Sequence, residues 1–344
     1  MRARSLAALA ALLATLAGAV QPGAPPRAPG VLGLPEVRPD LLADEVPLLL
    51  SDSPERPRQG GLLYRDTVRG EARVLAYHAN GLGRPARLVV LARDVGGAGG
   101  VLVTTRRGAA TTPGPDPAAG QQTLLRYLAS RPLAPRALPP GGAAVLYRSE
   151  PLAPDAVTSV MLDLRANAPT RLSVLMLADG ERLTPAGLEA LPVLARDDRH
   201  QRGTFRGANR TLRLTLPAGT ARLTLGGRED PALRGTDALT GEGQVLLGNY
   251  GVVYTLEVTG ARGRRLLLAP RGGVYRGVIG VEEGGRTLPV LIGRGRALRD
   301  PGAPAALWAA RRDPLTLRFV PGNGSNLPVA LVFSTGEEPR APGP

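Results

Sequence analysis

The chain has 344 residues, of which 43% are hydrophobic, enough to fill the core of one large domain or of two ordinary ones. Aromatic residues make up only 3%, and cysteine is absent, which excludes disulfides, thiolate metal sites and thiol catalysis. The 45 glycines and 34 prolines together form about 23% of the chain, well above ordinary usage, and predict many short elements joined by turns.

The formal net charge is +14, and every one of the 43 basic residues is arginine. Such a chain suits a polyanionic partner, such as nucleic acid, an acidic glycan or phospholipid headgroups. A GC-rich coding sequence produces the same arginine bias, together with many Ala, Gly and Pro residues. Because the arginines are spread along the chain, with no run longer than two, we favour this compositional explanation.

The N-terminus has the three parts of a secretory signal peptide. A basic segment, 1–4, precedes an apolar segment, 6–16, and Ala17-Gly18-Ala19 fits the small-x-small cleavage rule. Removal of residues 1–19 takes away two arginines and leaves a mature chain of charge +12 that begins near Val20. No later apolar run reaches the roughly 18 residues of a membrane span. We therefore expect an exported protein that is secreted, periplasmic or at the cell surface.

Residues 20–35 are rich in Pro, Gly and Ala and predict a flexible leader. A first β unit is expected over 36–180, with a turn at 66–70 and a helix at 118–130 that ends before Pro132. The segments between its strands are too short for helical crossovers, so the sheets should be mainly antiparallel. The strand candidates of this unit are 46–50, 61–64, 71–78, 86–91, 101–105, 143–149, 157–165 and 171–177.

A connector is expected at 181–202, where Thr184 caps a short helical turn. A second β unit follows at 203–336, and residues 337–344 predict a disordered tail. In this unit Leu212 and Leu214 alternate with Arg213, which places the arginine on the solvated face. Its strand candidates are 211–216, 221–225, 245–258, 265–269, 274–281, 287–292, 315–320 and 328–334.

This pattern predicts a mainly β fold of two antiparallel β-sandwich-like units with one or two short helices. One elongated domain with several sheets is the alternative. Many of the arginines should lie, like Arg213, on the outer faces of strands.

No motif commits the chain to a chemistry, because a phosphate loop, a dinucleotide fingerprint, a zincin motif and a Gly-x-Ser-x-Gly elbow are all absent. We therefore predict no catalytic residue, no cofactor and no metal site. Asp197, Asp198 and His200 lie too close together on one loop to surround a cation, and we interpret them as a solvated linker.

Two polar and aromatic clusters are the candidate ligand-binding residues. The first contains His78 with Tyr77 and Asn80, and the second contains Asn249 and Tyr250. A histidine in a strand can act as a ligand or general base, but a histidine packed in the core or at a sheet edge is the simpler interpretation. Polar turns likewise explain the second cluster.

Three segments resemble a family of exported, strand-rich bacterial proteins of unknown function, known chiefly from photosynthetic bacteria and their relatives. They are 46–80 (VPLLLSDSPERPRQGGLLYRDTVRGEARVLAYHAN), 121–130 (QQTLLRYLAS) and 248–258 (GNYGVVYTLEV), which are similar to the family's "SPE…GILL", "YL" and "GNYGV" signatures. The resemblance spans most of the mature chain. It implies an envelope or extracellular location and carries over no activity and no catalytic or binding residue.

These observations favour a non-catalytic envelope or cell-surface protein that recognises an acidic envelope polysaccharide, or another surface protein, through loops and arginine side chains. The alternative is a secreted hydrolase of envelope glycans or esters, which needs paired carboxylates or a Ser–His pair lining one cleft. His78 bonded to a Ser or Asp in a pocket would support that alternative. Nucleic-acid binding needs an arginine face with exposed aromatic residues, and the scarcity of aromatic residues argues against it.

Overall fold

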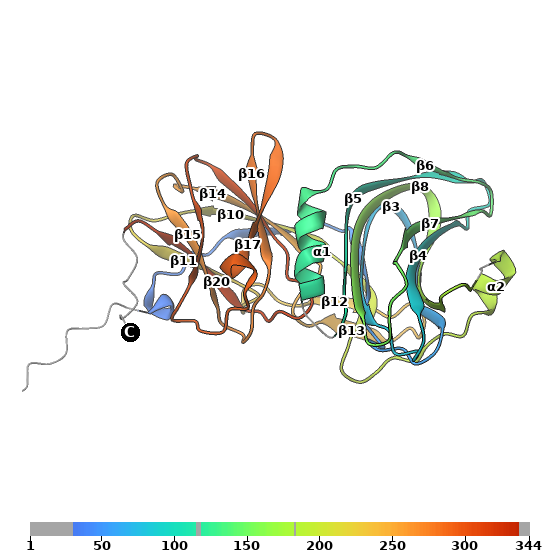
Figure 1. Ribbon diagram of the computed structural model, residues 1–344. Coiled ribbons are helices and arrows are strands. Elements are labelled where there is room, and N and C mark those ends of the chain that lie inside the picture. The colour runs from blue at the N-terminus through green and yellow to red at the C-terminus, as the bar shows by residue number, and fades with distance from the viewer. Residues whose placement is uncertain (1–29, 115–117, 182–183, 337–344) are drawn as a thin grey trace, which may run out of the picture.

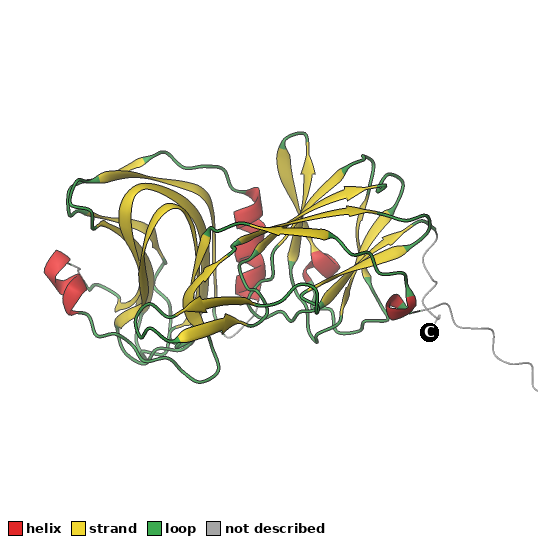
Figure 2. Ribbon diagram, turned by 180° about the vertical axis from the view of Figure 1, so that it is seen from behind, coloured by secondary structure: helices red, strands yellow, loops and turns green. Residues whose placement is uncertain are grey.

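The computed structural model describes residues 30–114, 118–181 and 184–336. The expected signal peptide and tail, 1–19 and 337–344, lie outside these ranges, as does most of the expected leader. The described chain is mainly β, as predicted, and its strands form three sheets (Figure 2). No helix in the part described is long and apolar enough to cross a lipid bilayer.

One large sheet builds the first unit. Its strands are β2 (Pro47–Ser51), β3 (Gly61–Ala79), β4 (Ala86–Asp94), β5 (Gly100–Thr112), β6 (Arg136–Leu138), β7 (Ala143–Arg148), β8 (Val157–Ala178), β9 (Arg202–Arg206), β12 (Leu233–Thr236) and β13 (Gly243–Leu246). The strand order is β13-β12-β9-β2-β3-β8-β4-β7, and β5 pairs with both β8 and β6 off this path.

The long strands β3 and β8 curve together, so this sheet folds over on itself (Figure 1). β5 pairs with the Val157–Ala166 half of β8 and β4 with the Thr170–Ala178 half, both on the edge opposite β3. The two halves enclose a core that includes Leu88, Leu162 and Val174. The bend produces a sandwich-like unit from a single sheet.

The sequence predicted two strands in place of each of these long ones, and that division is wrong. The polar stretch 66–70 continues the ladder with β8 instead of ending it. A register shift between Val68 and Gly70 takes up the curvature, as a β-bulge does, while Thr67 and Arg69 face solvent. Polar residues therefore mark a bend here and not a turn.

Two sheets that share one core build the second unit. The first is a six-stranded sheet in the order β1-β10-β14-β19-β16-β17, and the second is a four-stranded sheet in the order β11-β20-β15-β18. Neighbouring strands within these sheets are antiparallel, except that β10 and β14 are parallel. Their bounds are β1 (Asp40–Ala43), β10 (Asn209–Thr215), β11 (Ala221–Leu225), β14 (Val253–Thr259), β15 (Arg265–Pro270), β16 (Val278–Glu283), β17 (Arg286–Leu291), β18 (Ala305–Ala309), β19 (Leu315–Phe319) and β20 (Val329–Ser334).

The helix α1 (Ala118–Ala129) lies between the two units (Figure 1). Its Leu124 and Leu128 belong to the same core cluster as Leu48 and Leu75 of the first sheet and the apolar residues of the second unit. One hydrophobic core therefore continues from the second unit to the first sheet.

The sheets do not follow the chain order of the two expected units. β1, from the first half of the chain, pairs with β10, whereas β9, β12 and β13, from the second half, extend the first sheet beyond β2. Three short helices complete the fold: η1 (Val31–Gly33), η2 (Ile292–Gly295) and α2 (Pro185–Ala190). The Gly187 N–H donates to Thr184 Oγ1 at 3.0 Å, which confirms the predicted cap of α2.

Arginine is not confined to the outer faces of strands. Arg213 is, as predicted, 58% exposed. Arg73, Arg202 and Arg210, however, are only 3%, 2% and 4% exposed. Burial of these guanidinium groups is tolerated because each meets a carboxylate that lies far away in sequence.

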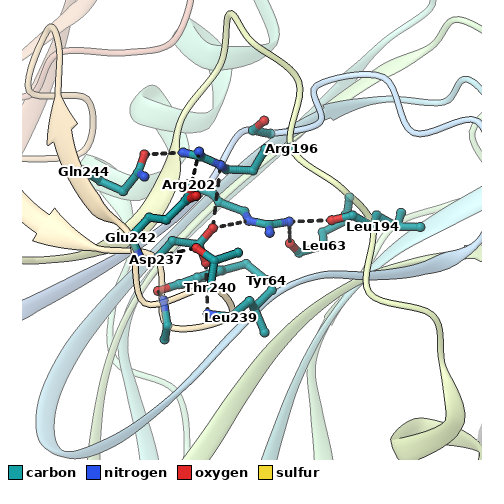
Figure 3. A network of polar contacts seen from close by, with 12 residues as sticks. Leu63, Tyr64, Leu194, Arg196, Arg202, Asp237, Leu239, Thr240, Glu242 and Gln244 are labelled. Carbon is teal, nitrogen blue, oxygen red and sulfur yellow. Dashed lines mark hydrogen bonds and ion pairs between the residues drawn. The ribbon is translucent and has the colours of Figure 1, made fainter.

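The network around Arg202 shows how such burial is achieved (Figure 3). Arg202 Nε lies 2.9 Å from Asp237 Oδ2, and Nη1 donates to the carbonyl oxygens of Leu194 and Leu63 at 2.6 and 3.0 Å. The second oxygen of Asp237 accepts the Leu239 N–H at 3.0 Å. Asp237 is fully buried, so this ion pair ties the loop after β12 to the interior of the first sheet.

Candidate functional site

Four polar turns from distant parts of the chain meet at one cavity of about 520 Å³ between the first sheet and the second unit. The turns are 51–55 after β2, 197–201 before β9, 247–251 between β13 and β14, and 321–326 between β19 and β20. We call it the junction cavity. Its lining includes Asp52, Glu55, Tyr77, His200, Tyr250 and Asn323.

Backbone contacts hold these turns together. The Asp52 N–H donates to the carbonyl of Gln201 at 3.0 Å, and the Gly251 N–H donates to the carbonyl of Pro321 at 3.1 Å. Gly251 has φ of 78°, and a Cβ there would lie 2.9 Å from Leu75 Cδ2. Only glycine therefore lets this turn approach the first sheet so closely.

The two predicted tyrosines, Tyr77 and Tyr250, line this one cavity, although one lies on β3 and the other in the turn before β14. The two predicted asparagines have structural roles. The Asn80 amide donates to two carbonyl oxygens, both at 2.8 Å, and its oxygen accepts the Leu82 N–H. Asn249 is 2% exposed and bonds to Leu233 and Tyr254.

His78 forms a Ser–His pair that the sequence did not reveal. Its Nδ1 lies 2.9 Å from the carbonyl oxygen of Pro54, which can only accept, so the Ser51 hydroxyl donates to Nε2 at 2.9 Å. Burial lowers the pKa of His78 to about 4. Both residues are 0% exposed and neither lines the junction cavity, so this pair does not supply the substrate-facing nucleophile that a hydrolase needs.

His200 links two carboxylates beside the cavity. Its Nδ1 lies 2.9 Å from Asp197 Oδ1 and its Nε2 lies 2.6 Å from Glu55 Oε2. Burial acts to raise the pKa of Asp197, but hydrogen bonds from the N–H groups of Glu55 and Arg199 and from His200 outweigh it and lower this pKa to about 2.

The expected solvated linker therefore has a structured part, since Asp197 and His200 pack against the 51–55 turn, whereas Asp198 is exposed. Within the described ranges, no group of three or more His, Asp or Glu side chains has a metal-binding arrangement.

Asp52 is the most perturbed carboxyl group of the junction cavity. It is 7% exposed, and its Oδ2 accepts the Asn323 amide at 3.3 Å. Burial, and then the charges of Glu55 and Asp197, raise the pKa of Asp52 well above its usual range. Two carboxyl groups thus line one cavity, as the hydrolase alternative requires, and Glu55 Oε2 lies 2.6 Å from His200 Nε2.

A second cavity, also of about 520 Å³, lies on the first unit and is lined by four arginines. We call it the arginine cavity. Arg107 comes from β5, Arg126 from α1, Arg136 from β6 and Arg148 from β7, and all four are exposed. Tyr147 and the apolar Val145 and Leu146 share the lining, which contains no acidic residue.

Internal contacts position this arginine cluster without neutralising it. The guanidinium groups of Arg126 and Arg136 donate to the carbonyl oxygens of Ala109 and Val145. Within the described chain, no ion pair joins any of the four arginines to a carboxylate, although the charge of Arg148 acts on Asp179. Three exposed arginines elsewhere are paired: Arg56 with Asp155, Arg165 with Glu71, and Arg213 with Glu257.

The sequence contains no signal for the arginine cavity. Its arginines come from four elements and only Arg107 has an arginine neighbour, so the pairing of β5 with β6 and the packing of α1 bring them together. Asp52 and Asn323 were also missed, because they lie in two turns that only the tertiary fold brings together.

No protein-family model matches this chain, and no curated protein matches it. Among solved structures, it is similar to the PBSX exported protein XepA, at 12% identity and a TM-score of 0.20, over 80% of this chain and 85% of that one. It is also similar to the CUB1-EGF-CUB2 domain of human MASP-1/3, at 10% identity and a TM-score of 0.17, over 78% and 98% of the two chains. TM-scores this low carry no argument about fold or function.

Proposed function

We propose that this protein is an exported, non-catalytic envelope or cell-surface protein that binds an acidic polysaccharide at the arginine cavity. The observation that carries the proposal is the set of four exposed arginines that line one cavity and that form no ion pair with any carboxylate of the described residues. Unpaired guanidinium groups are available to form paired hydrogen bonds with planar carboxylates, such as those of uronic acids.

The surroundings of the arginine cavity favour an extended ligand. A neighbouring cavity of about 570 Å³ shares Val145 and Arg148 with it and adds Leu177, Glu181 and Arg87, which is paired with Asp179, to the lining. A polymer that follows β7 can occupy both cavities, whereas a single small anion fills only one. Apolar and aromatic side chains between the arginines suit sugar rings better than they suit a bare phosphate.

The proposal is tested by retention on immobilised polygalacturonate, with dextran as the uncharged matrix. We expect retention on polygalacturonate only, and we expect the double variant Arg107→Gln/Arg148→Gln to elute at clearly lower salt. The matched control is Arg213→Gln, which removes an exposed arginine that is already paired with Glu257. If the double variant and the parent protein elute at the same salt concentration, the polysaccharide does not bind at the arginine cavity.

The export part of the proposal depends on the signal-peptide pattern at 1–19 and has its own test. Expression in a bacterial host, followed by fractionation and N-terminal sequencing, should yield a chain in the periplasm or medium that begins near Val20. Cytoplasmic protein that retains Met1 would contradict export.

A further inference from the structure

Two buried side-chain oxygens belong to residues that line the junction cavity. Asp52 and Asn323 are 7% and 5% exposed, and neither Asp52 Oδ1 nor Asn323 Oδ1 has a hydrogen-bond partner among the residues that the structure describes. Buried acceptors without partners are destabilising and are rare in folded proteins. The Asn323 oxygen accepts hydrogen bonds, and both oxygens of Asp52 accept them once this carboxyl group is ionised, so the ligand that completes the ionised site is a donor.

The charge around these oxygens favours a cationic donor. Glu55 lines the same cavity, and the charge of Asp197 also acts on Asp52. His200 lies between Glu55 and Asp197, and Arg199 lies on the exposed part of the lining. Arg199 lines the cavity too, but in the described chain no arginine or histidine forms an ion pair with Asp52, so this buried carboxyl group has acidic neighbours and no cation bound to it.

We propose that the junction cavity binds a primary ammonium group, which donates hydrogen bonds to Asp52 Oδ1 and Asn323 Oδ1. An ammonium group has three N–H donors and no acceptor, which matches two unpaired oxygens beside acidic side chains. Tyr77 and Tyr250 add aromatic rings to the lining, and aromatic rings attract cations. The cavity has room for an amino sugar or a short alkyl amine, two sources of the same group.

Binding of an ammonium group should release a proton. In the free protein the raised pKa of Asp52 keeps it protonated at pH values where an ordinary aspartate is ionised. A bound cation stabilises the carboxylate, so the proton leaves when the ligand binds. Affinity therefore falls as the pH falls below the pKa of free Asp52. Glu55, Asp197, His200 and Arg199 are the other charged groups that face this region.

The test is isothermal titration calorimetry at pH 6.5 with glucosamine and cadaverine, in two buffers that differ in ionisation enthalpy. At least one amine should bind and release up to about one proton per site, and N-acetylglucosamine, which lacks the ammonium group, should bind at least about tenfold more weakly. Binding of glucosamine alone identifies an amino sugar as the ligand, and binding of cadaverine alone identifies an alkyl amine.

The variant Asp52→Asn keeps the shape of the side chain and should weaken amine binding at least about tenfold, with no proton release. Glu150→Gln, an exposed carboxylate outside the lining, is the control and should bind as the parent does. The proposal is overturned if no amine binds, if N-acetylglucosamine binds as well as glucosamine, or if Asp52→Asn binds unchanged.

If Asp52→Asn does not fold, the comparison of glucosamine with N-acetylglucosamine on the parent protein is the deciding measurement. Equal binding of the two sugars would then overturn the proposal. The double variant Arg107→Gln/Arg148→Gln lies outside the junction cavity and should bind amines normally, so the two binding proposals fail or succeed separately.

Discussion

Replacement of Arg202 by methionine should destabilise the protein strongly, because it leaves Asp237 as a fully buried carboxylate without its guanidinium partner. Removal of one partner of a buried ion pair costs about 3–5 kcal/mol. The carbonyl oxygens of Leu63 and Leu194 lose their Arg202 donor as well. Arg196, at 3.8 Å from Asp237, and the Leu239 N–H partly compensate, so we expect a loss of about 4 kcal/mol.

Urea unfolding followed by far-UV circular dichroism measures this loss. With an m value of about 3 kcal/mol/M, the midpoint should fall by more than about 1 M. The control Arg213→Met breaks an exposed pair and should cost less than about 1 kcal/mol. The double variant Arg202→Met/Asp237→Leu should recover part of the loss, because it removes the unpaired charge. If Arg202→Met costs no more than Arg213→Met, the structural role given to buried arginine is wrong.

Two further predictions concern pH and packing. Between pH 6.5 and 4 the unfolded chain binds a proton at His78 that the folded chain does not. Acidification over this range should therefore lower the free energy of unfolding of the parent protein by roughly 3 kcal/mol more than it lowers that of His78→Gln. Identical pH slopes of urea stability for the two proteins would contradict this. Gly108→Ala should cost roughly 1–3 kcal/mol, because its Cβ would lie 2.1 Å from the Thr123 carbonyl oxygen of α1. Gly243→Ala, whose Cβ meets nothing within 4 Å, is the control, and equal midpoints would refute the packing argument.

The alternation of leucine with polar residues was sufficient to predict the fold class and several strands. It located β10 and β11 because Leu212 and Leu223 point into a core while their neighbours do not. It failed for β3 and β8, where polar residues occupy a bend within a strand. It also missed the short strands β9, β12 and β18, which are held by pairing with neighbours distant in the chain.

The candidate sites were predicted only in part, because tertiary contacts between distant residues decide which side chains line them. Tyr77 and Tyr250 stand out as aromatic residues near polar turns, and both line the junction cavity. Whether an arginine is buried or exposed depends on a carboxylate elsewhere in the chain: Asp163 reaches Arg73, whereas no carboxylate of the described chain reaches Arg107. That difference is set by tertiary structure, so a uniform arginine distribution conceals both the buried pairs and the arginine cavity.

The most direct measurement is the salt dependence of polygalacturonate binding by the parent protein and by Arg107→Gln/Arg148→Gln. Each guanidinium group that contacts a polyanion releases counterions, so the plot of log affinity against log salt should be less steep in the double variant by about one to two units. Arg213→Gln should keep the slope of the parent. Equal slopes for all three proteins, or equal affinity for uncharged dextran, would contradict recognition of an acidic polysaccharide at the arginine cavity.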